Sequence, residues 1–402
     1  MPSAASFAMP AYDLVAPSLV VFGAGRLAEL GQVVARFGRT AWLVSGGSGI
    51  EACGGRDAVG AVLLDAGVTS AWIATSRGEP TVGDVAAAVR TLPQAPHDVV
   101  VVAIGGGSAI DLAKAVAALA KNVAATADVD EQVVIDHLEG VGRGLPIAVP
   151  PLPVVAVPTT AGTGAEATRN AVISCPRRRF KKSMRSPLMV PRAAVIDPAL
   201  TVSCPPGVTA ATGLDAITQL VESFVCRFAA PLPRALVVEA LPRAVAALPR
   251  VLASPADLAA RAALSHAAFV SGVALTNSGL GMAHGVAAAL GIECGTPHGV
   301  ACGLMLPAAV ATNRPACRDD FALLERALDP GAPPDAGAAA DAFVRRIEMV
   351  CAASGIPRRL SDVGLDRGRL PWLAENSGGA SMRGNPVTLE PGGLLAVLER
   401  LW

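Results

Sequence analysis

Two histidines and one aspartate stand in contexts that suit a metal site. His284 and His298 are fourteen residues apart, and each is followed by glycine and surrounded by small residues. Asp215 begins an otherwise apolar helical pattern, where a buried carboxylate is costly unless it is paired or metal-bound. Gln219, four residues later, shares its face of the helix. One carboxylate and two imidazoles suit Zn(II) or Fe(II), although a core histidine with its own hydrogen-bond partner is the alternative for each imidazole.

A glycine-rich turn follows the most apolar predicted strand, residues 99–104. Gly105, Gly106 and Gly107 lead from that strand into a helical pattern near Ser108. Glycines let backbone N–H groups approach a ligand, and the start of a helix favours an anion. The segment predicts a cradle for a cofactor's pyrophosphate, with a plain turn capped by Ser108 as the alternative. The spacing does not match the GxGxxG fingerprint.

A second polar turn spans residues 158–166 and also follows an apolar strand. Its hydroxyls, on Thr159, Thr160 and Thr163, could bind the phosphates, sugar or amide of a cofactor. A polar turn would be the simpler interpretation if the segment stood alone. Two such turns at the ends of two strands of one sheet favour a cofactor site.

A third turn, residues 45–49, contains no acidic residue that could hold a ribose 2′-hydroxyl. Its small residues, including Gly46 and Ser48, leave room for a 2′-phosphate. The turn therefore favours NADP(H) slightly over NAD(H), although a plain glycine turn explains it nearly as well.

Short apolar runs alternate with Ala-rich helical patterns in the first half of the chain. This alternation predicts a parallel sheet with helices on both faces. The predicted strands are 18–22, 41–45, 70–75, 99–104, 154–157 and 194–196, and the predicted helices between them include 26–37, 82–92 and 110–120.

The second half shows helical lengths and no long β-branched runs. The predicted helices are 208–228, 232–252, 255–278 and 336–353, with prolines expected to kink or split the second. Two domains follow: an α/β dinucleotide-binding domain over 1–204 and an all-helical metal and substrate domain over 205–402. Ligands commonly bind in the crevice between such domains.

Composition excludes several classes of protein. With 33 basic and 33 acidic residues the net charge is zero, which argues against nucleic acid or an anionic membrane as partner. The chain is 52% hydrophobic, but its apolar runs are shorter than a spanning helix needs. The N-terminus shows no signal-peptide pattern, and the eight cysteines form no CxxC pair. We therefore expect a cytoplasmic protein with reduced thiols.

Together these segments resemble the iron-containing (group III) alcohol dehydrogenases, over nearly the whole chain and in family order. The matching motifs are 22–25, 105–108 with Asp111 and Lys114, 158–164, 197–198, 213–222 and the two histidines. The resemblance implies an N-terminal dinucleotide-binding domain, a helical C-terminal domain and a divalent metal between them. This architecture is shared with dehydroquinate synthase. The family's ligand positions fall on Asp215, Gln219, His284 and His298, and Lys182 matches a lysine near the cofactor.

The chain departs from the family pattern at two positions. Gln219 stands where the family usually has a third histidine, and an amide oxygen is a weaker ligand for Fe(II) or Zn(II). Three strong ligands remain, as in the more distantly similar zinc-dependent glycerol dehydrogenases. Ala288 stands where many members carry a histidine proposed to help move protons. Lys182 belongs to a basic cluster, 177–182, that is also explained by solvated charges.

These observations predict a metal-dependent oxidoreductase, an alcohol dehydrogenase or aldehyde reductase. It would transfer a hydride between NAD(P)(H) and a small alcohol or aldehyde. Asp215, His284 and His298 would act through the metal. One alternative is a metal-free reductase of the maleylacetate reductase type, which Gln219 and Ala288 favour. Others are a lyase resembling dehydroquinate synthase and a non-catalytic nucleotide-binding protein. By analogy with the family, the segment around 18–22 could pair across a homodimer.

Overall fold

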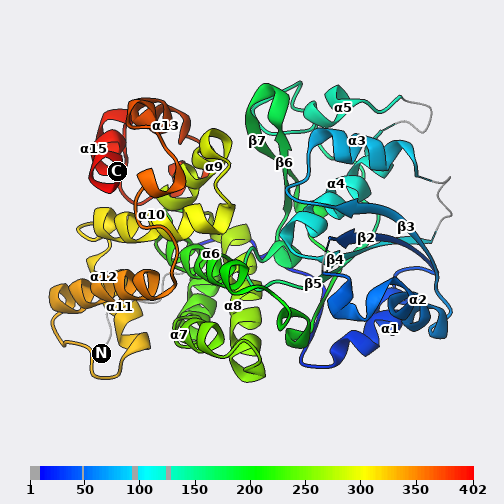
Figure 1. Cartoon of the computed structure of the whole chain (residues 1–402), viewed down its shortest axis with the longest axis horizontal. Coiled ribbons are helices and arrows are strands. Elements are labelled where there is room, and N and C mark those ends of the chain that lie inside the picture. Colours follow the sequence, from blue (N-terminus) through cyan, green and yellow to red (C-terminus); the bar gives the residue numbers. More distant parts are fainter. Residues whose placement is uncertain (1–9, 48, 93–97, 124–127) are drawn as a thin grey trace.

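The computed structural model of the chain describes residues 10–47, 49–92, 98–123 and 128–402. Figure 1 shows a sheet with its helices beside a bundle of helices, the former built from the first half of the chain and the latter from the second. The predicted combination of an α/β half and a helical half is confirmed.

Six parallel strands form the main sheet, in the order β1-β8-β5-β4-β2-β3. They are β1 (Leu19–Phe22), β2 (Thr40–Gly46), β3 (Thr69–Ser76), β4 (Val99–Gly105), β5 (Val154–Pro158) and β8 (Ala193–Ile196). Each coincides with a predicted strand to within one residue at either end.

Burial on both faces explains the unbroken apolar sequence of β4. Its side chains at 99, 101 and 103 join one core cluster, while those at 100, 102 and 104 join another on the opposite face. Because successive side chains of a strand point to opposite faces, a strand covered on both has no polar side. The covering helices include α1 (Leu30–Val34), α2 (Gly55–Asp65), α3 (Val82–Arg90), α4 (Gly107–Asn122) and α5 (Glu131–Ile135). The predicted helix 26–37 is a 3-10 turn, η2 (Arg26–Glu29), followed by the short α1.

The direction of the strand order reverses between β2 and β4. The chain passes from β2 outward to β3, returns to β4 and then continues away from β2 to β5. Ligands of open parallel sheets bind beyond the carboxyl ends of the strands at such a point. Ser45 is in register with Ile104, and Gly105 with Pro158, so β2, β4 and β5 end at the same edge.

An antiparallel hairpin, β6 (Asn170–Cys175) and β7 (Phe180–Arg185), was not predicted. Ala171, Ile173 and Cys175 alternate with less buried residues on β6 and pack into the core of the α/β half. The basic residues of β7 hide this alternation on the second strand. The hairpin contacts α4 on one side and α9 (Met282–Cys294) on the other, so it connects the two halves.

The helical half is built around α6 (Pro206–Val225), which packs against α7 (Pro231–Ala253), α8 (Leu258–Ser278) and α10 (His298–Asn313). The remaining helices are α11 (Arg318–Leu328), α12 (Ala336–Ala353), α13 (Leu370–Asn376), α14 (Ala380–Gly384) and α15 (Pro391–Leu401). The prolines of the second predicted helix do not split it, because α7 runs on through Pro242 and Pro249. Its buried residues recur at helical spacing, and their packing outweighs the missing N–H groups.

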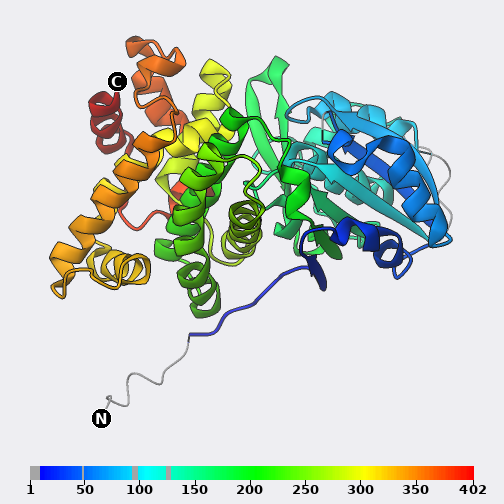
Figure 2. The ribbon, with the colours of Figure 1, turned by 60° about the horizontal axis from the view of Figure 1, so that its bottom comes forward.

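Within the described part of the chain, α8 is long and apolar enough to cross a membrane. However, 61% of its apolar window is buried inside the protein, and the helix packs against α6 and α7. This burial is typical of a core helix. Figure 2 shows the extended segment before β1 passing the helical half. The N–H of Val15 in that segment donates to Asn277 Oδ1 of α8 at 2.7 Å.

Candidate metal and cofactor site

The buried helix α6 carries Asp215 into the core of the helical half. The residue is 1% exposed, and Leu214, Ala216 and Ile217 around it are fully buried. An ionised carboxylate in such surroundings requires a positive partner. The expected partners come from two other helices: His284 lies in the first turn of α9, and His298 is the first residue of α10.

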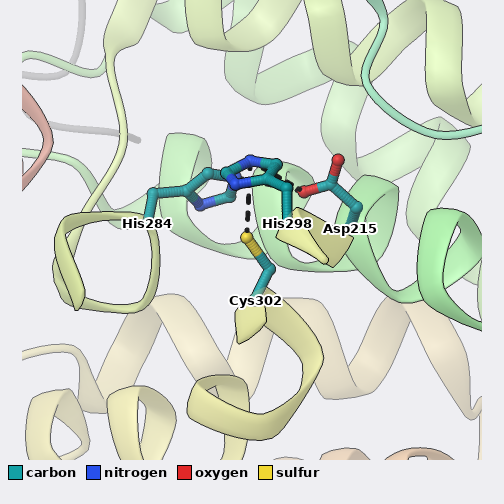
Figure 3. A group of neighbouring side chains, drawn as sticks. All are labelled: Asp215, His284, His298 and Cys302. Carbon is teal, nitrogen blue, oxygen red and sulfur yellow. Dashed lines mark hydrogen bonds and ion pairs between the residues drawn. The ribbon is translucent and has the colours of Figure 1, made fainter. Parts of the chain in front are cut away.

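The structure brings Asp215, His284 and His298 together (Figure 3). His284 Nε2 lies 3.3 Å from Asp215 Oδ1, and His298 Nε2 lies 3.7 Å from the same oxygen. The side chain of His284 is 4% exposed, whereas that of His298 is 30% exposed. The cluster is therefore buried on the α6 side and open on the His298 side.

Glu222, two turns after Asp215 on α6, fixes the orientation of His284. Its carboxylate accepts hydrogen bonds from the backbone N–H groups of Gly281 (3.0 Å) and Ala283 (2.6 Å) at the start of α9. It also accepts the Nδ1–H of His284 at 2.7 Å. With Nδ1 donating, the lone pair of Nε2 is directed toward Asp215, as in the carboxylate–histidine pairs of metal sites. Sequence reasoning included Glu222 in a motif but gave it no role.

Three atoms of this cluster lack hydrogen-bond partners in the described part of the chain. Asp215 Oδ1, His284 Nε2 and His298 Nδ1 are all buried, and the first two face each other. Buried polar atoms are normally satisfied, and leaving one unpaired costs about 1–3 kcal/mol. A carboxylate and two imidazoles are the donors that Zn(II) and Fe(II) take. The residues present therefore fit a divalent metal.

The members of the cluster shift one another's pKa. Burial alone would raise the pKa of Asp215, but the neighbouring imidazoles outweigh it and lower that pKa. Burial alone would lower the pKa of His284, but Cys302, Asp215 and Glu222 raise it well above its usual value. Burial lowers the pKa of His298 to about 4. An ionised carboxylate and a neutral imidazole are the forms that bind metals.

Gln219 lies beside this cluster with its amide already engaged. Its Oε1 accepts a hydrogen bond from Ser271 Oγ of α8 at 2.6 Å. Its Nε2 donates to the backbone oxygen of Thr163 at 3.3 Å. Gln219 thus connects α6 to the threonine-containing turn after β5.

Sequence reasoning missed two other neighbours of the cluster. Cys302 lies one turn after His298 on α10, fully buried, with Sγ 3.6 Å from His298 Nε2 (Figure 3). The spacing of four residues could have indicated it, because such residues share a helix face. Lys181 of β7 forms an ion pair with Glu79, and the charges of both act on His298. Lys181 and Glu79 belong to the α/β half of the chain.

The three predicted cofactor turns meet at the common edge of β2, β4 and β5. A Cβ added to Gly46 would lie 3.3 Å from the Cα of Gly105, and one added to Gly106 would lie 3.1 Å from Thr160 Oγ1. A Cβ on Gly107 would come within 2.5 Å of Thr163 Oγ1. The glycines thus allow the turns to pack against one another, a role that the sequence did not suggest.

The helix after β4 starts two residues earlier than a Ser108 cap would imply. Gly106 is the residue before its first turn, and Ser108 lies inside that turn, so Ser108 is not the cap. Ser108 and the start of α4 still lie at the sheet edge where the three turns meet. Thr159 lies in the same place: its N–H donates to the backbone oxygen of Gly105 at 3.0 Å, and its side chain is buried.

Asp111 and Lys114 form an internal pair in α4. Lys114 Nζ, with a fully buried side chain, lies 3.0 Å from Asp111 Oδ1 and donates to Thr168 Oγ1 (2.8 Å) and the backbone oxygen of Ala165 (3.0 Å). Asp111 Oδ2 accepts the N–H of Val172 at 3.0 Å. The pair holds α4 against the segments on either side of η4 (Ala165–Ala167).

Two further residues predicted to bind the cofactor are Lys182 and Ser48. Lys182 lies on β7, partly buried and in register with Ile173 of β6. Ser48 lies outside the described residues. Ser45, in the same turn, is fully buried, and its hydroxyl lies 3.1 Å from Thr75 Oγ1 of β3.

Stability is expected to depend on pH through Glu166. Burial raises the pKa of this residue from 4.5 to about 7, although Lys114 opposes the shift. Because the folded pKa is raised, the stabilisation is complete below pH 4.5 and is lost as the pH rises to 7. A shift of this size corresponds to roughly 3 kcal/mol. Denaturant unfolding of wild type and Glu166→Gln between pH 5 and pH 8 should show the variant gaining stability relative to wild type as pH rises. A constant difference would contradict the assignment.

Comparisons with known proteins agree with this architecture. The family model described as "Iron-containing alcohol dehydrogenase" matches residues 17–198, and "Fe-containing alcohol dehydrogenase family, C-terminal" matches residues 209–402. The probable alcohol dehydrogenase EutG of Escherichia coli K12 is 32% identical over 374 residues, covering 92% of this chain and 90% of that protein. The NAD-dependent methanol dehydrogenase of Bacillus methanolicus is 30% identical over 362 residues, covering 90% and 92%.

Among solved structures, a 1,3-propanediol oxidoreductase superposes with a TM-score of 0.87 at 27% identity, covering 98% of this chain and all of that one. Together with the two family models, which span both halves, this shows an oxidoreductase of a family whose members use a metal and a nicotinamide cofactor. The chain belongs to the iron-containing alcohol dehydrogenase family.

Proposed function

We propose that this chain is a metal-dependent alcohol dehydrogenase or aldehyde reductase that transfers a hydride between NADP(H) or NAD(H) and a small alcohol or aldehyde. The observation that carries the proposal is the convergence of an unpartnered buried carboxylate, Asp215, with the unpartnered Nε2 of His284. His298 completes the group on its open side.

Asp215, His284 and His298 would hold Fe(II) or Zn(II). When bound, the metal polarises the substrate oxygen and the nicotinamide gives or takes the hydride. Glu222 keeps the Nε2 of His284 directed toward Asp215. The partial exposure of His298 leaves the substrate a way to the cluster.

The edge of the sheet would bind the cofactor through Gly46, Ser48, Gly105, Gly106, Gly107, Ser108, Thr159, Thr160 and Thr163, with Asp111 and Lys182 as neighbours. This edge lies beside the metal cluster, because Gln219 of α6 donates to the backbone of Thr163. A Cβ on Gly162 would also meet Thr212 of α6 at 2.5 Å. The helix that carries Asp215 therefore packs directly on a cofactor turn.

We propose NADP(H) as the preferred cofactor. The guanidinium of the exposed Arg56 donates to Thr75 Oγ1 at 2.9 Å, and that hydroxyl in turn lies near Ser45 at the end of β2. An arginine at this end of a dinucleotide-binding sheet accommodates a 2′-phosphate. Kd values for NADPH and NADH, compared in wild type and Arg56→Ala, decide between the two cofactors.

Proton transfer would run through water, a ribose hydroxyl or another side chain. Ala288 lies one turn after His284 on α9 and carries no group that could move a proton. We also propose that the chain divides into domains 1–204 and 205–402 and that it acts in the cytoplasm. It also includes a homodimer, which is supported by the position of β1 at the edge of the sheet.

Reduction of short aldehydes tests the proposed function. Chain reconstituted anaerobically with Fe(II) or Zn(II) should bind about one metal per chain and consume NADPH or NADH only when aldehyde is present. Removing the metal with a chelator should abolish turnover and preserve cofactor binding. Turnover that survives complete metal removal would indicate the metal-free reductase instead. Cofactor binding without aldehyde-dependent consumption would indicate a non-catalytic protein.

A further inference from the structure

The helix α10 presents a thiol to the metal cluster one turn after its first residue. Cys302 follows His298 by four residues, so both side chains lie on the same face of the helix. Figure 3 shows the sulfur of Cys302 directed toward the imidazoles rather than into the packed side of α10. The residue is fully buried and forms no disulfide.

The distances between donor atoms agree with a four-donor site. Donors that lie ~2.0–2.3 Å from a tetrahedral ion are about 3.3–3.8 Å from one another. Asp215 Oδ1 lies 3.3 Å from His284 Nε2 and 3.7 Å from His298 Nε2, and Cys302 Sγ lies 3.6 Å from His298 Nε2. The donor atoms of all four residues lie within 4.8 Å of one another.

Gln219, by contrast, is held away from this role. Its two amide atoms are paired with Ser271 and with the backbone of Thr163. Turning the amide oxygen toward a metal would break the bond to Ser271 inside the protein, and the freed groups would cost about 1–3 kcal/mol each. Asp215 Oδ1 and His284 Nε2 have no such bonds to lose.

Charge also favours the cysteine. A divalent ion bound by the carboxylate of Asp215, two neutral imidazoles and an amide leaves one net positive charge in a buried site. With a thiolate instead of the amide, the ion and its four donors carry no net charge, while the nearby carboxylate of Glu222 is held by the Nδ1–H of His284 and by two backbone N–H groups. A coordinated thiol loses its proton, so metal binding forms a metal–sulfur bond and releases one proton to solvent.

We propose that Cys302, not Gln219, is the fourth side-chain ligand of the metal, alongside Asp215, His284 and His298. This inference rests on the proposed metal-dependent function. A sulfur donor shifts the preference of the site toward thiophilic ions such as Zn(II).

Cobalt substitution tests the proposal directly, because a thiolate bound to Co(II) gives a charge-transfer absorption in the near ultraviolet. Metal-free wild type titrated anaerobically with Co(II) should develop this band up to one equivalent. The band should be lost in Cys302→Ala, with metal affinity lowered at least about 10-fold. It should remain in Gln219→Leu and in the matched control Cys351→Ala, a buried cysteine of α12.

A second measurement does not depend on any variant. The X-ray absorption spectrum of Zn(II)-bound wild type should show one sulfur neighbour at ~2.3 Å from the metal, beside nitrogen and oxygen neighbours at ~2.0–2.2 Å. Stoichiometric Co(II) binding without the band, or a band that persists in Cys302→Ala, would overturn the cysteine assignment and leave the proposed function standing. Failure of wild type to bind Co(II) or Zn(II) at all would overturn both.

Discussion

Replacing Asp215 by alanine is expected to abolish metal binding and to lower kcat/KM for aldehyde reduction by at least about 10³-fold. Its Oδ1 is the atom that approaches both His284 Nε2 and His298 Nε2. Without it the buried site loses the carboxylate that offsets the charge of the ion. The fold-change follows from losing the several kcal/mol that a bound metal contributes to the transition state, at 1.36 kcal/mol per tenfold.

A stability measurement separates loss of metal from loss of fold. The imidazoles lower the pKa of Asp215, so its carboxylate stabilises the metal-free fold, and the metal-free variant should be somewhat less stable than metal-free wild type but still unfold cooperatively. Adding Zn(II) should raise the melting temperature of wild type, because a ligand that binds the folded state stabilises it. The variant should show no such rise.

Asp341→Ala serves as the control for this experiment. Asp341 is an exposed residue of α12 whose carboxylate pairs with Arg314 on the surface, and it takes no part in the metal cluster. Its removal should change neither metal content nor turnover. If Asp215→Ala retains one metal per chain and full activity, Asp215 is not a ligand and the proposed site is wrong.

Local pattern was sufficient to predict the strands of the sheet and to single out Asp215, His284 and His298, which the structure brings together. β4 is buried on both faces, so its sequence is apolar throughout, and this identifies it as a strand covered on both sides. Each donor could be recognised separately from its local sequence. Asp215 is a charged residue in an apolar helical pattern, and His284 and His298 are each followed by glycine.

Features that depend on contacts between distant segments were not predictable in the same way. The engagement of Gln219 depends on Ser271, which is 52 residues away and lies on a different helix. The role proposed for Cys302 depends on the helix α10 including His298, because residues four apart lie on one face only when a helix spans both. The β6–β7 hairpin was missed because β7 carries two lysines and an arginine that are only partly buried, so the strand shows no clear alternation of apolar and polar residues.

Replacing Lys114 by methionine is expected to lower the free energy of unfolding by about 3–5 kcal/mol, because it leaves a largely buried carboxylate without its partner. Asp111 is 14% exposed in its side chain and would keep only the N–H of Val172. Thr168 Oγ1 and the backbone oxygen of Ala165 would also lose a charged donor. Denaturant unfolding measures the change. Lys121→Met, on an exposed position of the same helix, should stay within about 0.5 kcal/mol of wild type.

Variants of Asp111 and Lys114 test whether Asp111 binds the cofactor or stabilises the fold. If Asp111 binds the cofactor, Asp111→Asn should raise the Kd for NADPH while the unfolding free energy hardly changes. If Asp111 instead pairs with Lys114 to stabilise the fold, Asp111→Asn should destabilise the chain, because it leaves a buried ammonium group without its carboxylate partner.

The double variant Asp111→Asn with Lys114→Met should then lose less unfolding free energy than the sum of the two single changes, since neither charge is left alone. Since Lys114 also holds the segment that follows the threonine turn, destabilised variants should bind NADPH more weakly in parallel with their loss of stability. Strictly additive stability changes would show that the two residues act independently and that Asp111 is free to contact the cofactor.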